Sequence, residues 1–174
     1  YYTLAFKEWE RSKNISGLST AYNNLGIVLD EKGDLQKALE YYTKSLEFAT
    51  QQRDSSGIAT AYNNIGFLYA RIKQFDKALM SYQKSYEISV KTNGVDAAHN
   101  TLNNIASTYL KQNNLEKASE ALNKALRNIP NVVDQAYKQE TYQLLSDLYA
   151  KKGDYRNAYH YKCVELAYAD TLYT

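Results

Sequence analysis

The chain has 174 residues, 44% of them hydrophobic, which is enough to bury the core of one domain. Its 21 basic and 19 acidic residues give a formal net charge of only +2, which argues against a dedicated surface for nucleic acid or an acidic membrane. A single cysteine excludes an internal disulfide and a cysteine-rich zinc site, and no apolar run is long enough to span a bilayer.

The first predicted element is a helix over residues 1–18. Residues 1–20 repeat the pattern of residues 41–60, and both segments begin with Tyr-Tyr-Thr. The chain is therefore expected to open on the second helix of a repeat whose first helix is missing. Since residue 1 is Tyr and not Met, we expect the sequence to be part of a longer protein.

A six-residue motif that starts at Ala21 marks the first complete repeat. It reads Ala-Tyr-Asn-Asn-Leu-Gly, and related motifs start at positions 61, 101 and 141, so the spacing from position 21 onward is 40 residues. Self-similarity at a fixed spacing indicates a stacked array of one supersecondary unit. The predicted repeats of this single array cover residues 19–58, 59–98, 99–138 and 139–174.

Each repeat is predicted to contain two helices. In the second repeat, bulky and small residues recur at helical intervals in two runs, which are Tyr62, Ile65, Gly66 and Tyr69, then Phe75, Ala78, Leu79 and Tyr82. Small residues on the first helices are expected to face alanines on the second helices and to allow close crossing. These pairs are Gly26 with Ala38, Gly66 with Ala78, Ala106 with Ala118, and Ser146 with Ala158.

The turn between the two helices has a signature of its own. Gly33-Asp34, Asn113-Asn114 and Gly153-Asp154 each join a residue that tolerates the left-handed conformation to one that can cap the next helix. The second repeat has Lys73-Gln74 at this place. We expect its turn to survive with a weaker cap.

This spacing of small and bulky residues resembles the tetratricopeptide repeat (TPR) family, whose landmarks match Tyr62, Ile65-Gly66, Tyr69, Ala78 and Tyr82. The unit of 40 residues is six longer than the family's usual 34, so the chain is most similar to longer-unit members such as kinesin light chains and the sensory arms of bacterial regulators. The resemblance implies an all-α fold, a right-handed α-solenoid of stacked helix-turn-helix hairpins.

The last repeat departs from the others on its second helix. Lys162 and Glu165 stand where earlier repeats have Tyr42 or Tyr82 and Ser45 or Ser85. Because a terminal repeat needs a polar outer face, we expect both Lys162 and Glu165 to be exposed and the two tyrosines to be buried.

In the TPR family the first helices line the inner surface of the superhelix. Their side opposite the core is therefore predicted to form the floor of a groove. The floor positions are Thr20, Asn24, Ile27, Glu31, Thr60, Asn64, Phe67, Arg71, Asn100, Asn104, Ser107, Lys111, Glu140, Leu144, Asp147 and Lys151.

Two rows of polar side chains stand out on this predicted floor, with Ile27 and Phe67 as apolar patches. One row is Asn24, Asn64 and Asn104, and the other is Arg71, Lys111 and Lys151. A side-chain amide both donates and accepts, so a row of amides can bond to the backbone of an extended peptide whatever its sequence.

Both rows also have a structural interpretation. The asparagines could bond to the adjacent repeat and fix the stacking, and the basic residues could face water near helix ends. The same holds for the neighbouring asparagines at positions 23, 63 and 103. The candidate peptide-binding residues are Asn24, Phe67, Asn64, Asn104, Arg71, Lys111, Lys151, Asn63 and Asn103.

Catalytic patterns are sparse. His160 and Cys163 lie three residues apart on the last helix and could form a nucleophile pair, but no orienting residue is implied, and ordinary packing is the favoured interpretation. There is no glycine-rich phosphate loop and no His-carboxylate metal spacing. We expect no enzyme activity, no metal site and no cofactor.

The leading hypothesis is a scaffold that holds a protein or an extended peptide segment in the concave groove. The alternatives are a sensory arm of a bacterial regulator whose output domain lies outside this sequence, and a structural self-association module. Nucleic acid and direct membrane contact are not expected, while the exposed terminal repeats could support a homodimer. A soluble protein is expected, with the cytoplasm favoured over the periplasm.

Overall fold

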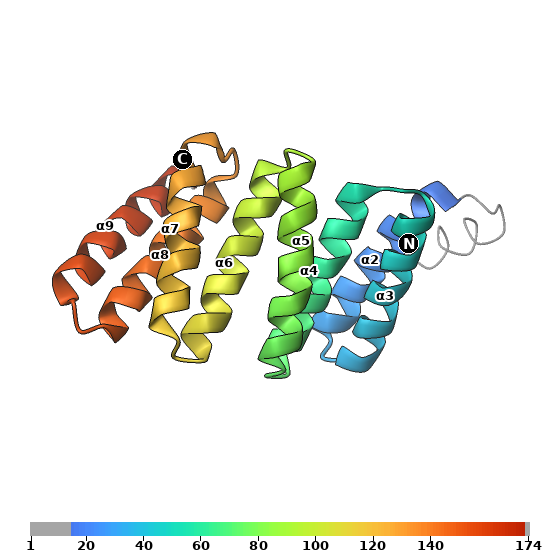
Figure 1. Cartoon of the computed structure of the whole chain (residues 1–174), viewed down its shortest axis with the longest axis horizontal. Coiled ribbons are helices and arrows are strands. Elements are labelled where there is room, and N and C mark those ends of the chain that lie inside the picture. Colours follow the sequence, from blue (N-terminus) through green and yellow to red (C-terminus); the bar gives the residue numbers. More distant parts are fainter. Residues whose placement is uncertain (1–14, 173–174) are drawn as a thin grey trace. The chain divides into compact units, whose positions relative to one another are not determined.

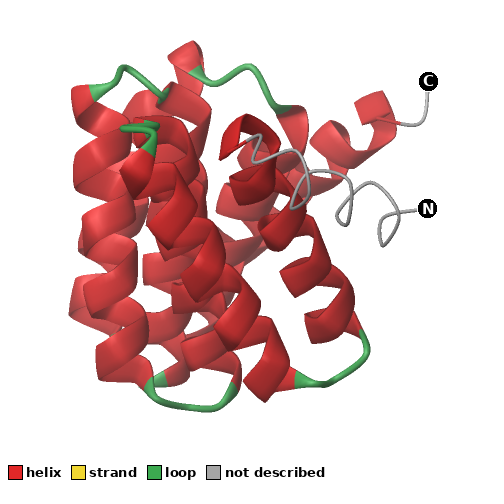
Figure 2. Ribbon diagram, turned by 90° about the vertical axis from the view of Figure 1, so that its right-hand side faces the viewer, coloured by secondary structure: helices red, strands yellow, loops and turns green. Residues whose placement is uncertain are grey.

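The computed structural model describes residues 15–172 of the chain. Within this part there are eight α-helices and one short 3-10 helix, and no strand (Figures 1 and 2). The elements in chain order are α2 (Ile15–Glu31), α3 (Leu35–Gln51), α4 (Ser55–Arg71), α5 (Phe75–Lys91), α6 (Val95–Lys111), α7 (Leu115–Asn128), η1 (Ile129–Asn131), α8 (Gln135–Lys151) and α9 (Tyr155–Leu172). The helix predicted at residues 1–18 lies outside the described residues up to position 14, and residues 15–18 belong to α2.

The helices pack as hairpins within two compact units, which meet at Thr92 and Asn93 along the chain. In the first unit α2 pairs with α3 and α4 pairs with α5, and α4 also packs against α2 and α3. In the second unit α6 pairs with α7 and α8 pairs with α9, and α8 packs against α6 and α7. The predicted all-α fold of stacked helix-turn-helix hairpins is therefore confirmed.

The turns inside the hairpins form as the sequence predicts. Gly33 and Gly153 have φ angles of 82° and 76°, and Asn113 has a φ angle of 57°. Glycine enters this left-handed region without a steric penalty, and asparagine tolerates it. The residue that follows each of them caps the next helix: Asp34 accepts a bond from Lys37 N (3.3 Å), Asn114 from Lys117 N (3.2 Å) and Asp154 from Asn157 N (3.1 Å).

The second repeat keeps its turn and loses its cap, as expected. Lys73 adopts a φ angle of 61° in spite of its Cβ atom. Gln74 stands at the capping position of α5 but makes no side-chain capping bond. The turn is held by backbone bonds from Lys73 N to Ala70 O (3.2 Å) and from Gln74 N to Tyr69 O (2.9 Å).

The glycines of the first helices in the first two repeats lie against tyrosine rings. A Cβ atom on Gly26 would lie 2.6 Å from the ring of Tyr42, and one on Gly66 would lie 2.7 Å from the ring of Tyr82. In the first two repeats the missing side chain therefore makes room for a tyrosine ring. The pairs at the same positions in the third and fourth repeats are Ala106 with Leu122 and Ser146 with Lys162.

The link between the third and fourth hairpins is longer than the other links. Helix α7 ends at Asn128 and is followed by η1, which contains Pro130. The carboxylate of Asp96, at the start of α6, accepts a bond from Val133 N (2.8 Å) and so ties this link to α6. Val132 is buried beside it.

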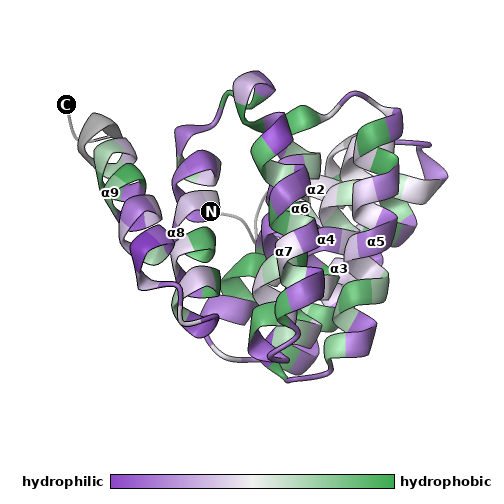
Figure 3. Ribbon diagram, turned by 60° about the vertical axis from the view of Figure 1, so that its left-hand side comes forward, coloured by the Kyte–Doolittle hydropathy of each residue, from purple (hydrophilic) through white to green (hydrophobic). Residues whose placement is uncertain are grey.

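The hydrophobic core of the first unit joins consecutive hairpins. One side of α3 packs into a cluster with Ile65 and Leu68 of α4, and the α3 residues concerned are Leu35, Ala38, Leu39, Tyr42 and Leu46. Hydrophobic and hydrophilic segments alternate along the helices (Figure 3). None of the described helices is long and apolar enough to cross a membrane.

Of the two α9 residues predicted to be exposed, Lys162 and Glu165, only Lys162 is exposed. Lys162 is exposed and Tyr42 and Tyr82 are buried, as expected, but Glu165 is only 6% exposed. The prediction for Glu165 was wrong because its position faces the first helix of its own hairpin. The equivalent Ser45 bonds to Ser19 of α2 in this way. The buried carboxylate of Glu165 is paired with Lys162 Nζ at 2.5 Å.

Candidate polypeptide-binding surface

In the first unit, the side of α2 and α4 opposite their core residues forms a mixed polar and apolar surface, which we call the α2/α4 face. It carries Thr20, Asn24 and Ile27 on α2, and Thr60, Asn64, Phe67 and Arg71 on α4. Ile27 is 39% exposed and Phe67 is 45% exposed. The two largest apolar side chains of the predicted floor in this unit therefore lie open to solvent.

The side chain of Asn64 links the two helices of this face. Its Nδ2 atom donates a hydrogen bond of 2.7 Å to Asn23 Oδ1 on α2. A side-chain amide has two N–H donors and an oxygen with two lone pairs, so this bond uses only part of the capacity of Asn64. Asn24 and Asn63 are half-buried next to these two residues in the sequence.

Arg71 is held at the other end of the face by Asp30. Its guanidinium forms an ion pair with the Asp30 carboxylate and donates a bond of 3.2 Å to the Asp30 carbonyl oxygen. The side chain of Asp30 is 10% exposed and that of Arg71 is 40% exposed. The buried carboxylate therefore positions a guanidinium that still reaches solvent.

Asn103 in the second unit has a different environment. It is fully buried, and its Nδ2 atom donates to Tyr137 O (3.0 Å) and to Glu140 Oε2 (3.2 Å) of α8. Its Oδ1 atom accepts a bond of 2.8 Å from the Thr141 hydroxyl. This side chain joins α6 to α8 and is not accessible to a partner, so Asn103 is left out of the surface proposed below.

Two titratable groups belong to the same buried contact between α6 and α8. His99 Nε2 lies 2.8 Å from Thr141 Oγ1, and His99 Nδ1 is buried with no hydrogen-bond partner among the described residues. Burial lowers the pKa of His99 below its usual value. Burial also raises the pKa of Glu140, although the bond from Asn103 acts in the opposite direction.

The remaining candidates of the second unit lie on the matching side of α6 and α8. Asn104 is half-buried, and Lys111 and Lys151 are exposed in the last turns of their helices. Leu144 was expected on this surface but is only 9% exposed. Ile27 and Phe67 correspond to Ser107 and Asp147 in the second unit, so the apolar patch of the first unit has no counterpart there.

A small polar hollow, which the sequence did not indicate, opens beside the α2/α4 face. Its volume is about 240 Å³, and it is lined by Ser19, Thr20, Asn23, Ser45, Asp54, Ser56, Gly57 and Thr60. Ser19 and Ser45 bond to each other's carbonyl oxygens at 3.1 and 2.8 Å across its base. The only signal in the sequence was Ser19, which stands where the next repeat has Ala59.

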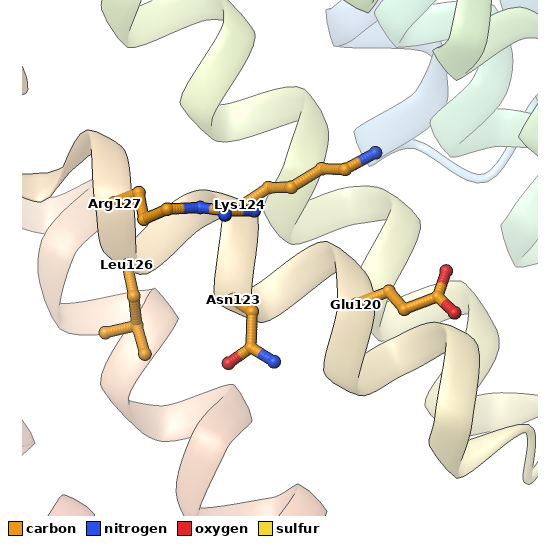
Figure 4. A pocket seen from close by; sticks show the side chains of 5 residues that line it. All are labelled: Glu120, Asn123, Lys124, Leu126 and Arg127. Atoms are coloured by element: carbon orange, nitrogen blue, oxygen red, sulfur yellow. The ribbon is translucent and has the colours of Figure 1, made fainter.

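A second hollow borders α7. It has a volume of about 600 Å³ and is lined by Glu120, Asn123, Lys124, Leu126 and Arg127. Figure 4 shows that these side chains leave a single helix in different directions and do not converge on a common point. This hollow therefore offers no arrangement of groups that would hold one ligand.

On α9, His160 and Cys163 each have another side chain as a neighbour. The ring of His160 contacts the edge of Tyr161, with 5.2 Å between the ring centroids. A hydrogen bond with Cys163 raises the pKa of Tyr159, so the thiol has Tyr159 as a neighbour. Among the described residues there is no group of three or more His, Cys, Asp or Glu that could hold a metal ion.

Solved structures with similar folds are repeat proteins that are distant in sequence. RapI in its apo form aligns with a TM-score of 0.85 at 18% identity, over 98% of this chain and 62% of that one. BtubC (BKLC) from P. vanneervenii aligns with a TM-score of 0.78 at 20% identity, over 91% and 65%. A Rap protein complexed with Competence and Sporulation Factor aligns with a TM-score of 0.76 at 18% identity, over 88% and 43%. The chain spans less than two thirds of each of these proteins, and the likeness concerns the fold alone.

Sequence comparison identifies the family directly. No curated protein matches the chain. Profiles of the tetratricopeptide repeat match residues 19–49 and residues 57–131, which together are more than half of the chain. Both matched segments lie in the hairpins described above. The chain belongs to the tetratricopeptide repeat family.

Proposed function

We propose that the chain is a non-catalytic scaffold that binds a segment of a partner protein on the α2/α4 face. The observation that carries the proposal is the exposure of Ile27 and Phe67 between two polar groups, Asn64 and Arg71. Large apolar side chains surrounded by polar ones are typical of contact surfaces, where aromatic residues act as anchors. The partner is therefore expected to contribute at least one apolar side chain.

The polar groups of the face suit the backbone of an extended segment. Asn64 is held in place by its bond to Asn23 and retains hydrogen-bonding capacity. Arg71 is oriented by Asp30, so little side-chain entropy would be lost when it binds a carbonyl or a carboxylate. Such preorganisation favours binding without selecting one sequence, which fits a segment recognised mainly through its backbone.

In the second unit we assign a supporting role to Asn104, Lys111 and Lys151. The two lysines are exposed, and they would attract an acidic segment in a manner that depends on salt. The Rap protein complexed with Competence and Sporulation Factor gives a precedent for a related fold that carries a bound factor. Because the identity is 18%, it supports the fold of the scaffold and not the nature of the ligand.

The test uses a displayed library of random 12-residue peptides. Peptides selected on the wild-type chain are measured by fluorescence anisotropy against Ile27→Ser, Phe67→Ser and the matched control Met80→Ser, whose residue is 65% exposed on α5. Removing an anchor of this kind costs about 1–3 kcal/mol, so the first two variants should bind roughly 5- to 150-fold more weakly. The control should bind like the wild type.

Two results would contradict the proposal. Selection that yields no peptide with a dissociation constant below about 1 mM would leave the chain without a peptide-binding surface. Selected peptides that bind equally well to all three variants would place the binding surface elsewhere on the molecule.

A further inference from the structure

The outer side of α9 carries an uncovered stripe of large side chains. Tyr155 is 75% exposed, Tyr159 is 74% exposed and Leu166 is 51% exposed, and the exposed Lys162 lies between them in the sequence. These residues follow one another at i, i+4, i+7 and i+11, which places them on one side of a helix. Within the second unit α9 packs against α8 through other residues, among them Ala158, Tyr161 and Tyr168. We call these four residues the α9 stripe.

The repeat itself shows what this side of a second helix does. The four positions of the stripe correspond, 120 residues earlier, to Leu35, Leu39, Tyr42 and Leu46 of α3. Those α3 residues share a hydrophobic cluster with Ile65 and Leu68 of α4. The stripe is therefore the packing surface of α9 for another helix, and no described helix covers it.

The stripe is complementary to itself. Positions 155 and 166 have the same midpoint as positions 159 and 162, between residues 160 and 161. When two such helices pack antiparallel about that midpoint, Tyr155 faces Leu166 of the other copy and Tyr159 faces Lys162. All four positions thus find a partner in one register, as a two-fold symmetric contact requires.

The contact between Tyr159 and Lys162 matches a pairing that this chain already uses. Within the described residues, five lysines place Nζ 5.0–5.7 Å from the centroid of a tyrosine ring. Lys162 is also neutralised by the buried Glu165, so two copies would not bring together unpaired positive charges. A lysine over a tyrosine ring is favourable when the pair is partly shielded from water.

We propose that two copies of this chain associate through the α9 stripe, with the two α9 helices antiparallel. Two tyrosines, a leucine and a lysine stem from each copy bury roughly 800 Å² in total, which is below the roughly 1,200 Å² of a standard specific interface and in the range of weak, transient contacts. The dimer is therefore weak, with a dissociation constant on the order of 10–100 µM. The stripe shares no residue with the α2/α4 face, so this proposal does not depend on the peptide-binding one.

Sedimentation equilibrium over a range of protein concentrations tests the association. The wild type should shift from monomer to dimer, while Tyr155→Asp and Leu166→Asp should raise the dissociation constant at least tenfold. Met80→Asp, which puts the same charge on an exposed position of α5, should behave as the wild type. Circular dichroism of each variant checks that the fold is kept.

Cysteine cross-linking tests the register in a Cys163→Ser background. Positions 155 and 166 of opposite copies lie close enough for a disulfide, whereas two copies of position 155 lie about 16 Å apart along the helix axis. An equimolar mixture of the Tyr155→Cys and Leu166→Cys proteins should therefore form a heterodimeric disulfide, and neither protein alone should do so.

Three results would overturn the proposal. The first is a wild-type chain that stays monomeric at about 1 mM, ten times the weakest constant expected. The second is a dimer that the two aspartate variants leave intact, and the third is cross-linking of either cysteine variant with itself. A monomeric chain whose α9 stripe instead binds a synthetic α4 peptide (residues 55–71) would assign the surface to another helix and would equally overturn the dimer.

Discussion

Gly26 and Gly66 differ from Ala106 and Ser146 in lacking a Cβ atom, and the residue across each hairpin changes with them. Tyrosine faces both glycines, with its ring where a Cβ atom would lie. Leu122 and Lys162 stand at the same position when a Cβ atom is present. The two positions therefore act as one packing unit, since a close-packed interior leaves no room for both a tyrosine ring and an added methyl group.

Gly66→Ala should destabilise the chain by about 1–3 kcal/mol, because the new Cβ atom would overlap the ring of Tyr82. Adding Tyr82→Leu should recover part of that loss, because the pair then matches Ala106 and Leu122 of the third repeat. Urea unfolding of the wild type, both single variants and the double variant measures the coupling. If the two single effects simply add, the positions are independent and this explanation fails.

The packing of α8 on α6 differs from that of α4 on α2 at the scale of whole elements. The α2/α4 contact includes a bond between the half-buried Asn23 and Asn64, and an ion pair between the buried Asp30 and the exposed Arg71. The α6/α8 contact instead buries His99, Asn103 and Thr141 completely. A buried polar network is stable only while its members keep the protonation state that satisfies it.

Stability should therefore depend on pH through His99. Because its pKa is lowered in the folded chain, the unfolded chain takes up the proton first as the pH falls. His99 thus has no effect well above about pH 6.5, and below that value it lowers stability until the pH reaches the folded pKa. The groups that act on its ring are Asp96, Tyr137, Lys138 and the Thr141 hydroxyl.

Between about pH 7.5 and 5.5 the wild type should lose up to about 1 kcal/mol more than His99→Gln does. Urea unfolding at each pH gives this difference, and NMR titration of the imidazole in a His160→Gln background gives the pKa itself. Equal pH dependence of the wild type and His99→Gln would refute the assignment to His99.

Glu140 acts in the opposite direction. Because its pKa is raised in the folded chain, the folded chain takes up a proton first and gains stability as the pH falls toward 4.5.

Across the whole molecule, the asparagines at neighbouring positions of the repeat have different environments. Asn64 and Asn104 are half-buried on the side of α4 and α6 assigned to the partner, while Asn103 is fully buried. Asn103 and Asn104 are adjacent on α6 but differ in accessibility. Replacing each of them can therefore separate an effect on affinity from an effect on stability.

Asn64→Ala combined with Asn104→Ala should weaken binding of the selected peptides by roughly 5- to 150-fold, if each lost amide is worth about 0.5–1.5 kcal/mol. A modest drop in melting temperature is expected as well, because Asn23 loses its bond to Asn64. Asn103→Ala is the matched control, and it should lower the melting temperature while the folded protein keeps its affinity. Thermal melts and anisotropy titrations on the same samples separate the two effects.

The reverse pattern would count against the asparagine row as a binding element. A large fall in melting temperature with unchanged affinity of the folded double variant would mean that Asn64 and Asn104 serve the stacking of helices, as Asn103 does.

The sequence alone determined the helices, the hairpin turns and the register of the repeats. These depend on local rules, such as the apolar period of a helix and the left-handed conformation of Gly33, Asn113 and Gly153. Such rules act over a few residues. Because the same sequence pattern recurs every 40 positions, the helices predicted in one repeat support those predicted in the next. Even the uncapped turn at Lys73 could be predicted in this way.

Only the tertiary structure decided what each polar side chain meets. Asn23 and Asn103 occupy equivalent positions, yet Asn23 is half-buried and accepts a bond from Asn64 of α4, while Asn103 is fully buried and donates to Tyr137 and Glu140 of α8. Glu165 was misjudged because its burial depends on its own hairpin partner and not on a following repeat. Contacts between helices depend on side chains about 40 residues apart, and the periodicity of a single helix carries no information about them.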